Sequence, residues 1–148
     1  ESLGLAVLER DREEFMAMLD NCLGGAGSAL ERLDCFFEAA LSLHRGRGFV
    51  GGCLWGNTAL EMSDSNLAFA DFVAQVFDEW TDRLIAVIRE GQDEGRIRDN
   101  VSAEKLAQSV VATIEGGIML SRLKKDEAPL KGCLDMARLL LLGGTDGE

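Results

Sequence analysis

One run of apolar residues at helical spacing dominates the middle of the chain. Large apolar side chains recur every three or four residues from Leu67 through Trp80 to Ile88. Because this spacing is close to the 3.6-residue turn of an α-helix, it places them on one face of a helix. The pattern predicts a helix from about Ser65 to Glu94, which is the longest element of the chain and the one around which the others pack.

Five further segments show the same periodicity. They run from the first residues to about Cys22, from Ser28 to about His44, over a short segment at roughly Cys53–Met62, from Ser102 onward, and from 126–129 to about Leu142. Proline occurs once among 148 residues, and no run alternates apolar with polar side chains. We therefore expect an all-α chain that folds as one domain over residues 1–148, in a six-helix orthogonal bundle.

Local signals mark particular points on these helices. Ser28 and Glu31 have the spacing of a capping box, and Gly95 indicates a glycine-terminated helix end. Gly116 and Gly117 lie in the middle of a predicted helix, where each costs about 1 kcal/mol relative to alanine. Such a pair predicts that another backbone or a ligand approaches this helix closely.

Aromatic residues are concentrated in one part of the chain. Both tryptophans and four of the seven phenylalanines fall between Phe49 and Trp80. In a small helical domain, this aromatic mass forms either the core or the wall of an apolar ligand cavity. We also expect polar residues, which a plain core rarely carries, beside these aromatic side chains: His44, Asn57, Glu61, Glu115 and Arg122. We interpret the region as both core and cavity, and a solidly filled core is the alternative.

Two features have more than one interpretation. His44 stands near the end of its predicted helix, where the helix dipole favours a partly exposed histidine, but it could also hydrogen bond within the cavity. The charged segment Glu9–Glu14 is either a solvated helix face or a source of charge that enters a pocket or contacts a neighbouring domain.

Composition excludes several classes of function. The net charge is −11 and the basic residues are scattered, which argues against direct binding to DNA or to an anionic membrane. No apolar run approaches the roughly 18 residues of a membrane span. One histidine cannot supply a His-rich metal site, and no hydrolase, P-loop or metalloprotease motif is present. We expect no enzyme activity, no metal and no cofactor, with four reduced cysteines in a cytoplasmic protein.

The last two predicted helices suggest self-association. They place small residues beside large aliphatic ones, which suits close helix pairing: Ala107, Ala112, Gly116, Gly117 and Ala137. Leu139–Leu142 is apolar on all sides, which is more than one contact within the chain needs. Two such helices that meet their symmetry mates would form a four-helix dimer interface.

The order of several short motifs resembles a known family. These motifs are Glu1-Ser2-Leu3, Gly52-Cys53-Leu54, Ala59-Leu60-Glu61, Phe77 with Trp80, Glu90-Gly91, Gly95-Arg96-Ile97, Leu106-Ala107 and Ile114-Glu115-Gly116-Gly117. In this order and spacing, nearly the whole chain resembles the C-terminal regulatory domain of TetR-type transcriptional repressors.

The resemblance implies a domain that binds a small, largely apolar effector and forms a homodimer. The pocket would lie between the first five helices, with these ligand-binding residues: Phe36, His44, Trp55, Asn57, Phe69, Phe72, Trp80, Glu115 and Met119. The last two helices, at about 103–124 and 128–142, would form the dimer interface through Ala112, Gly116, Leu120, Leu123, Leu130, Cys133, Leu134, Ala137 and Leu141. Ligand binding would shift the first helix.

The resemblance also implies that DNA is bound by an N-terminal helix-turn-helix domain, which is absent from this chain. Because the first residues already have a mid-helix pattern, we expect a segment to precede Glu1. The alternative from another class is a helical adaptor without a ligand cavity, which would bind a protein partner through Leu139–Leu142.

Overall fold

Six α-helices make up the fold in the computed structural model, which describes residues 2–143. They are α1 (Ser2–Leu23), α2 (Ala29–Gly46), α3 (Leu54–Met62), α4 (Leu67–Asp93), α5 (Ala103–Lys124) and α6 (Ala128–Leu142). No strand occurs within the described range. The prediction of an all-α fold with six helices is therefore confirmed, and α4 is the longest of the six.

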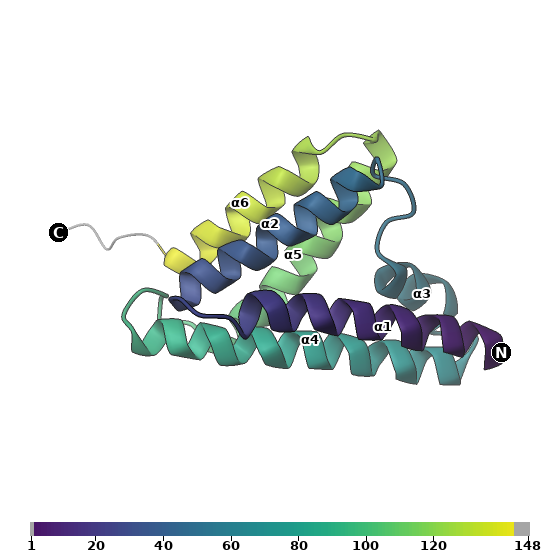
Figure 1. Cartoon of the computed structure of the whole chain (residues 1–148), viewed down its shortest axis with the longest axis horizontal. Helices are drawn as coiled ribbons and strands as arrows, with labels where there is room; N and C mark the ends of the chain where they lie inside the picture. The colour runs from purple at the N-terminus through teal and green to yellow at the C-terminus, as the bar shows by residue number, and fades with distance from the viewer. Residues whose placement is uncertain (1, 144–148) are drawn as a thin grey trace.

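The helices form two groups that cross each other. α1 and α4 lie side by side along the long axis of the molecule and run in the same direction (Figure 1). α2, α5 and α6 run obliquely across them, while α3 lies near the start of α1. The pair formed by α5 and α6 is in extensive contact along its length. α5 crosses α4, so the two groups meet over a shared core.

The buried stripes predicted from the sequence meet between these groups. The largest fully buried side chains come from five helices: Leu19, Leu33, Phe36, Leu84, Ile88, Leu106, Ile114, Leu130 and Leu141. An ion pair links α1 to α4 at the edge of this core, because Nη2 of Arg12 lies 2.8 Å from both carboxylate oxygens of Glu79.

The predicted helix ends are present as well. The backbone N–H of Glu31 donates to Ser28 Oγ and the N–H of Ser28 donates to Glu31 Oε2, both at 3.3 Å, which completes the capping box. At the end of α4, Gly95 has a φ of +74° and the Arg96 N–H donates to the Gly91 carbonyl at 2.9 Å. This hydrogen bond and the positive φ of Gly95 are those of a Schellman motif, which satisfies carbonyls that the helix end would leave free.

Within the described residues, no helix combines the length and the apolar character that crossing a membrane requires.

Candidate ligand-binding site

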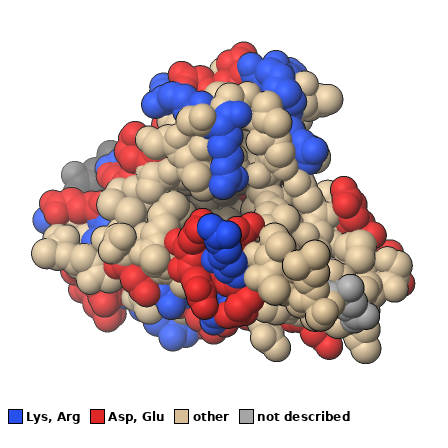
Figure 2. Space-filling model, turned by 45° about the vertical axis from the view of Figure 1, so that its right-hand side comes forward, with Lys and Arg blue, Asp and Glu red and all other residues tan. Residues whose placement is uncertain are grey.

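A cavity of about 250 Å³ lies between α1, α2, α3, α4 and α5. Figure 2 shows one face of the molecule hollowed near its centre, with basic side chains above the hollow and, below it, acidic side chains around a basic one. Most of the wall is apolar or aromatic, from these residues: Phe15, Met18, Phe36, Ala40, Leu43, Leu54, Trp55, Trp80, Ile114 and Ile118. A concave, mostly apolar site with a few polar groups is the usual form of a small-molecule site.

The loop before α3 sets one side of this cavity. Gly51 and Gly52 have φ values of +87° and +67°, which glycine adopts without the strain that a Cβ would bring. This turn brings Cys53 and Trp55 to the cavity wall. A hydrogen bond stabilises the same turn, because Asn57 Nδ2 donates to the Gly51 carbonyl at 2.6 Å.

Four aromatic rings form the innermost wall. Phe15 packs edge-on against Trp80, with ring centroids 5.4 Å apart, and lies 6.4 Å from Trp55. Phe36 also packs edge-on against Trp80, with ring centroids 6.0 Å apart. Rings from α1, α2, α3 and α4 therefore meet at one point, and such pairs add about 0.5–1.5 kcal/mol each beyond the area they bury.

Glu115 places a carboxylate among these apolar walls. Its Oε1 atom is buried and has no hydrogen-bond partner among residues 2–143. The other oxygen, Oε2, occupies the space beside Gly56, where a Cβ would collide with it. Burial raises the pKa of Glu115, while the thiol of Cys53 acts in the opposite direction. A buried carboxylate oxygen without a partner is costly, so Glu115 is the polar point that a ligand would have to match.

Cys53 places a thiol beside the cavity. Burial, followed by the charge of Glu115, raises the pKa of its thiol far above the ordinary value. Because the thiolate is the nucleophilic form of cysteine, this thiol is a poor nucleophile at neutral pH.

The opening of the cavity carries charges of both signs. Asp11 and Glu14 of α1 line it together with Arg47, which follows α2. His44 is buried, and burial together with the charge of Arg47 lowers its pKa, so its imidazole is neutral at pH 7. With Glu115, the lining holds three carboxyl groups against one guanidinium.

The residues predicted for the ligand site divide into two sets. Five of them line the cavity: Phe36, His44, Trp55, Trp80 and Glu115. Four lie outside it: Asn57, Phe69, Phe72 and Met119. Phe72 packs behind Trp55 with ring centroids 6.4 Å apart, and Asn57 accepts a hydrogen bond from Arg122 at 3.1 Å. Phe69 packs against the core near Gly4, and Met119 is 57% exposed.

Some lining residues were not predicted. Phe15 and Met18 stand on the predicted apolar stripe of the first helix, so the sequence marked them as buried without assigning them to the cavity. Of the charged segment Glu9–Glu14, Asp11 and Glu14 line the cavity, while Arg12 turns to α4.

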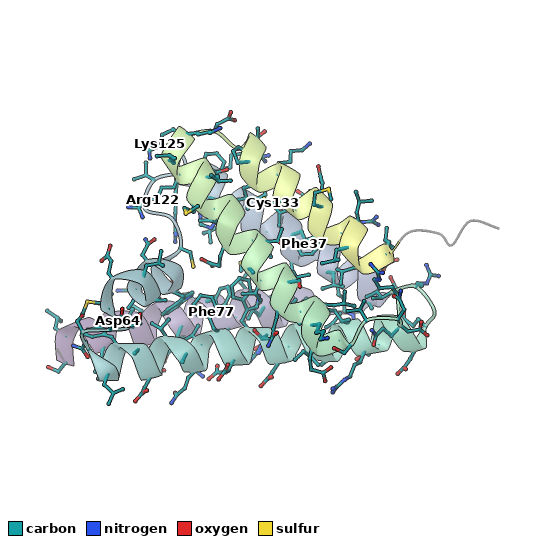
Figure 3. The ribbon with its side chains drawn as sticks, turned by 180° about the vertical axis from the view of Figure 1, so that it is seen from behind. Phe37, Asp64, Phe77, Arg122, Lys125 and Cys133 are labelled. Carbon is teal, nitrogen blue, oxygen red and sulfur yellow. The ribbon has the colours of Figure 1, made fainter. Side chains whose placement is uncertain are left out.

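The outer face of α5 and α6 carries a second concentration of apolar side chains. Large apolar residues on it are exposed: Met119, Leu120, Leu123, Met136 and Leu139. Figure 3 views the molecule from this side, with α5 and α6 in front and Cys133 between them. Gly116 opens onto free space, whereas Gly117 faces α6. We call Ala112, Gly116, Met119, Leu120, Leu123, Met136 and Leu139 the outer face.

The residues predicted for the dimer interface also divide. Ala112, Gly116, Leu120 and Leu123 lie on the outer face, and Cys133 is half-buried between α5 and α6. Leu130, Leu134, Ala137 and Leu141 are buried within the protomer, where they pack against its own core.

These features define an all-helical domain with an aromatic cavity and an exposed apolar helix pair. Residues 29–136 match the family described as Tetracyclin repressor-like, C-terminal domain. The chain belongs to this family of TetR-type transcriptional regulators.

Individual relatives agree with that membership. The chain is 26% identical to the HTH-type transcriptional repressor DhaR of Mycobacterium sp. (strain GP1), across 99% of this chain and 72% of that protein. The crystal structure of the regulatory protein TetR from Rhodobacter sphaeroides is similar, with a TM-score of 0.87 and 28% identity over 93% of this chain and 74% of the other. A TetR transcriptional regulator from Chloroflexus aurantiacus has a TM-score of 0.82 and 28% identity over 93% and 70% of the two chains.

Proposed function

We propose that this chain is the effector-binding and dimerisation domain of a TetR-type transcriptional repressor. The observation that carries the proposal is the cavity of about 250 Å³, which is walled by four aromatic rings and lined by side chains of α1. In this proposal a small molecule enters the cavity, and DNA is bound by a separate helix-turn-helix domain that lies outside these residues.

The cavity lining supports a sensing role because α1 and α4 both contribute to it. A ligand can shift an equilibrium between two arrangements only by as much as its affinities for them differ. A ligand that contacts Phe15 on α1 and Trp80 on α4 favours the relative position of these helices that packs best around it. The coupling step is therefore a movement of α1 and involves no chemical reaction.

The outer face supports the dimerisation part of the proposal. Four large side chains on it are more than half exposed: Met119, Leu123, Met136 and Leu139. A second copy that placed its own α5 and α6 on this face would cover them in a symmetric four-helix contact. The open space at Gly116 would let two α5 helices approach closely.

A ligand screen that uses tryptophan fluorescence tests the sensing role. Trp55 and Trp80 are the only two tryptophans and both line the cavity, so a bound molecule should change the emission directly. Ala40→Phe, which fills the cavity wall, should abolish the response to any hit. Ala86→Phe on the exposed side of α4 should preserve it. A response that survives Ala40→Phe would place binding elsewhere.

The alternative, a helical adaptor without a ligand cavity, would bind a different protein through Leu139–Leu142, of which Leu139 is exposed. It is favoured if the screen gives no hit and light scattering gives a monomer at micromolar concentration.

A further inference from the structure

The proposed function leaves the chemistry of the ligand open, and the polar groups of two residues that line the cavity bear on it. Oε1 of Glu115 and Nε1 of Trp80 are both buried without a hydrogen-bond partner among residues 2–143. Both residues line the same cavity. Buried polar groups in folded proteins are nearly always paired. The carboxylate of Glu115 needs a hydrogen-bond donor, whereas the indole N–H of Trp80 needs an acceptor. A pure hydrocarbon would leave the carboxylate of Glu115 unpaired, so the cavity fits a ligand that carries a hydrogen-bond donor of its own.

The sign of the ligand's charge follows from the groups that face the cavity. The lining carries three carboxyl groups, from Asp11, Glu14 and Glu115, against the single guanidinium of Arg47. His44 contributes no charge at neutral pH. Arg122 lies behind Gly52 and donates to Asn57, so it is engaged outside the lining. An anion would meet an excess of carboxyl groups, whereas a cation would gain a partner at Glu115.

The aromatic wall points in the same direction. Trp55, Trp80 and Phe15 line the same cavity as Glu115 and pack against one another. A cation held against such rings is attracted to their negative faces, and tryptophan is the best of the aromatic side chains for this contact. Aromatic rings combined with one buried carboxylate favour an organic ammonium ion over a neutral molecule of the same shape.

The size of the cavity limits the rest of the molecule. An apolar cavity of about 150 Å³ is enough to hold benzene, and drug-sized ligands occupy about 300 Å³ or more. The cavity here measures about 250 Å³. One aromatic ring with a short side chain fits these limits.

We propose that the ligand of this cavity is a small arylalkylamine in its cationic form, whose ammonium group donates a hydrogen bond to Glu115 while its ring packs between Phe15, Trp55 and Trp80. The inference rests on the proposed function and specifies the chemical class that the site takes. A covalent electrophile is the poorer candidate because Cys53, the thiol beside the site, is held in its protonated form.

Three probes with one skeleton and different charges test this inference. They are 2-phenylethylammonium, neutral 2-phenylethanol and the phenylacetate anion, titrated at about pH 7.5, where an alkylamine is protonated. Binding is followed by tryptophan fluorescence and by calorimetry. A charge-assisted hydrogen bond predicts that the cation binds at least about tenfold more tightly than the alcohol, and that phenylacetate binds most weakly.

Glu115→Gln provides the decisive comparison, since it keeps the shape of the side chain and removes its charge. The variant should lose the preference for the cation, so that 2-phenylethylammonium and 2-phenylethanol bind to it with similar Kd values. Glu61→Gln makes the same change on the exposed side of α3 and should retain the full preference. A preference that persists in Glu115→Gln overturns the assignment of the ammonium group to Glu115.

The remaining outcomes separate this inference from the proposed function. If 2-phenylethanol or phenylacetate binds as tightly as the cation, and Ala40→Phe abolishes that binding, the cationic class is refuted and the sensing role stands. If none of the three probes binds at millimolar concentration, the arylalkylamine class is refuted, and the sensing role is then decided by the wider screen.

Discussion

Gly117 of α5 lies directly against Cys133 of α6. A Cβ on Gly117 would stand 2.9 Å from the Cβ of Cys133, closer than real Cβ contacts allow, and 3.1 Å from the Cα of Leu130, closer than most of them. The neighbouring Gly116 has no atom within 4 Å of the equivalent position. Two adjacent glycines therefore have different roles, since one admits α6 and the other leaves the outer face of α5 open.

Alanine at these two positions should give different effects on the protomer. Gly117→Ala should leave the free energy of unfolding about 1–3 kcal/mol below that of Gly116→Ala, because α6 must move away to admit the methyl group. Gly116→Ala gains about 1 kcal/mol of helix propensity and meets nothing within the protomer. Urea denaturation of both variants measures the difference. Equal stabilities would mean that α5 and α6 are not held at this spacing.

A charge on the outer face should dissociate the proposed dimer. The Leu123 side chain is 76% exposed, so Leu123→Glu should leave the protomer folded. If the face is covered by a second copy, this change should weaken association by on the order of 2 kcal/mol, about thirtyfold in Kd. Light scattering gives the mass, and Leu60→Glu, at an exposed site on α3, is the matched control.

A substitution at Leu134 tests whether this residue stabilises the folded protomer or the dimer. It is only 5% exposed within a single protomer, so Leu134→Ala should cost about 2–5 kcal/mol of unfolding free energy. Circular dichroism with thermal melting measures this loss. A variant that keeps its stability and loses only its dimeric mass would place Leu134 on the surface.

The stability of the ligand-free protein should depend on the protonation of Glu115. Its pKa is raised by burial, so the folded state favours the neutral acid, and ionisation at higher pH lowers stability. Glu115→Gln, which resembles the neutral acid, should raise the thermal midpoint at pH 8. The gain should shrink as the pH falls and vanish below 4.5, the ordinary pKa of glutamate. A variant less stable than the parent at pH 8 would show that the ionised carboxylate is stabilised by its surroundings.

The cysteines should differ in their rates of alkylation. Burial, together with the neighbouring Cys35, raises the pKa of Cys22 to about 11, and burial also raises that of Cys53. Cys35 is exposed and should react first with iodoacetamide near pH 7.5, about tenfold or more ahead of the other two. Peptide mapping by mass spectrometry gives the rates, and in concentrated urea the difference should disappear. Rapid labelling of Cys53 in the folded protein would contradict its burial.

The helices could be predicted because their determinants are local. Apolar spacing, the Ser28–Glu31 capping box and the Gly95 helix end each depend on residues within one or two turns. The position of each side chain around a helix is harder to predict. Ile118 lines the cavity and Met119 is exposed, although both are apolar neighbours. One residue rotates a side chain by about 100° around a helix, so an error of one position moves it from the wall to the surface.

α6 shows a second limit, which comes from having two apolar faces. Leu130, Leu134 and Leu141 face the core, while Met136 and Leu139 face outward. Both sets have helical spacing, so periodicity alone cannot tell which one the protomer buries. Prediction of the cavity wall had a similar limit, because Phe15 and Trp80 are 65 positions apart in the sequence and meet only when α1 lies beside α4.

The ion pair between Arg12 and Glu79 gives α1 a fixed point partway along its length. At a rise of about 1.5 Å per residue, Met18 in the cavity wall lies about 9 Å beyond this point and Ser2 about 15 Å before it. A second ion pair, between Asp20 of α1 and Arg83 of α4, lies beyond Met18. If that pair gives way and α1 pivots at Arg12 as a rigid rod, a displacement at Met18 is enlarged about 1.7-fold at Ser2 and reversed in direction. A molecule that pushes the wall outward would thus swing the opposite end of the helix inward.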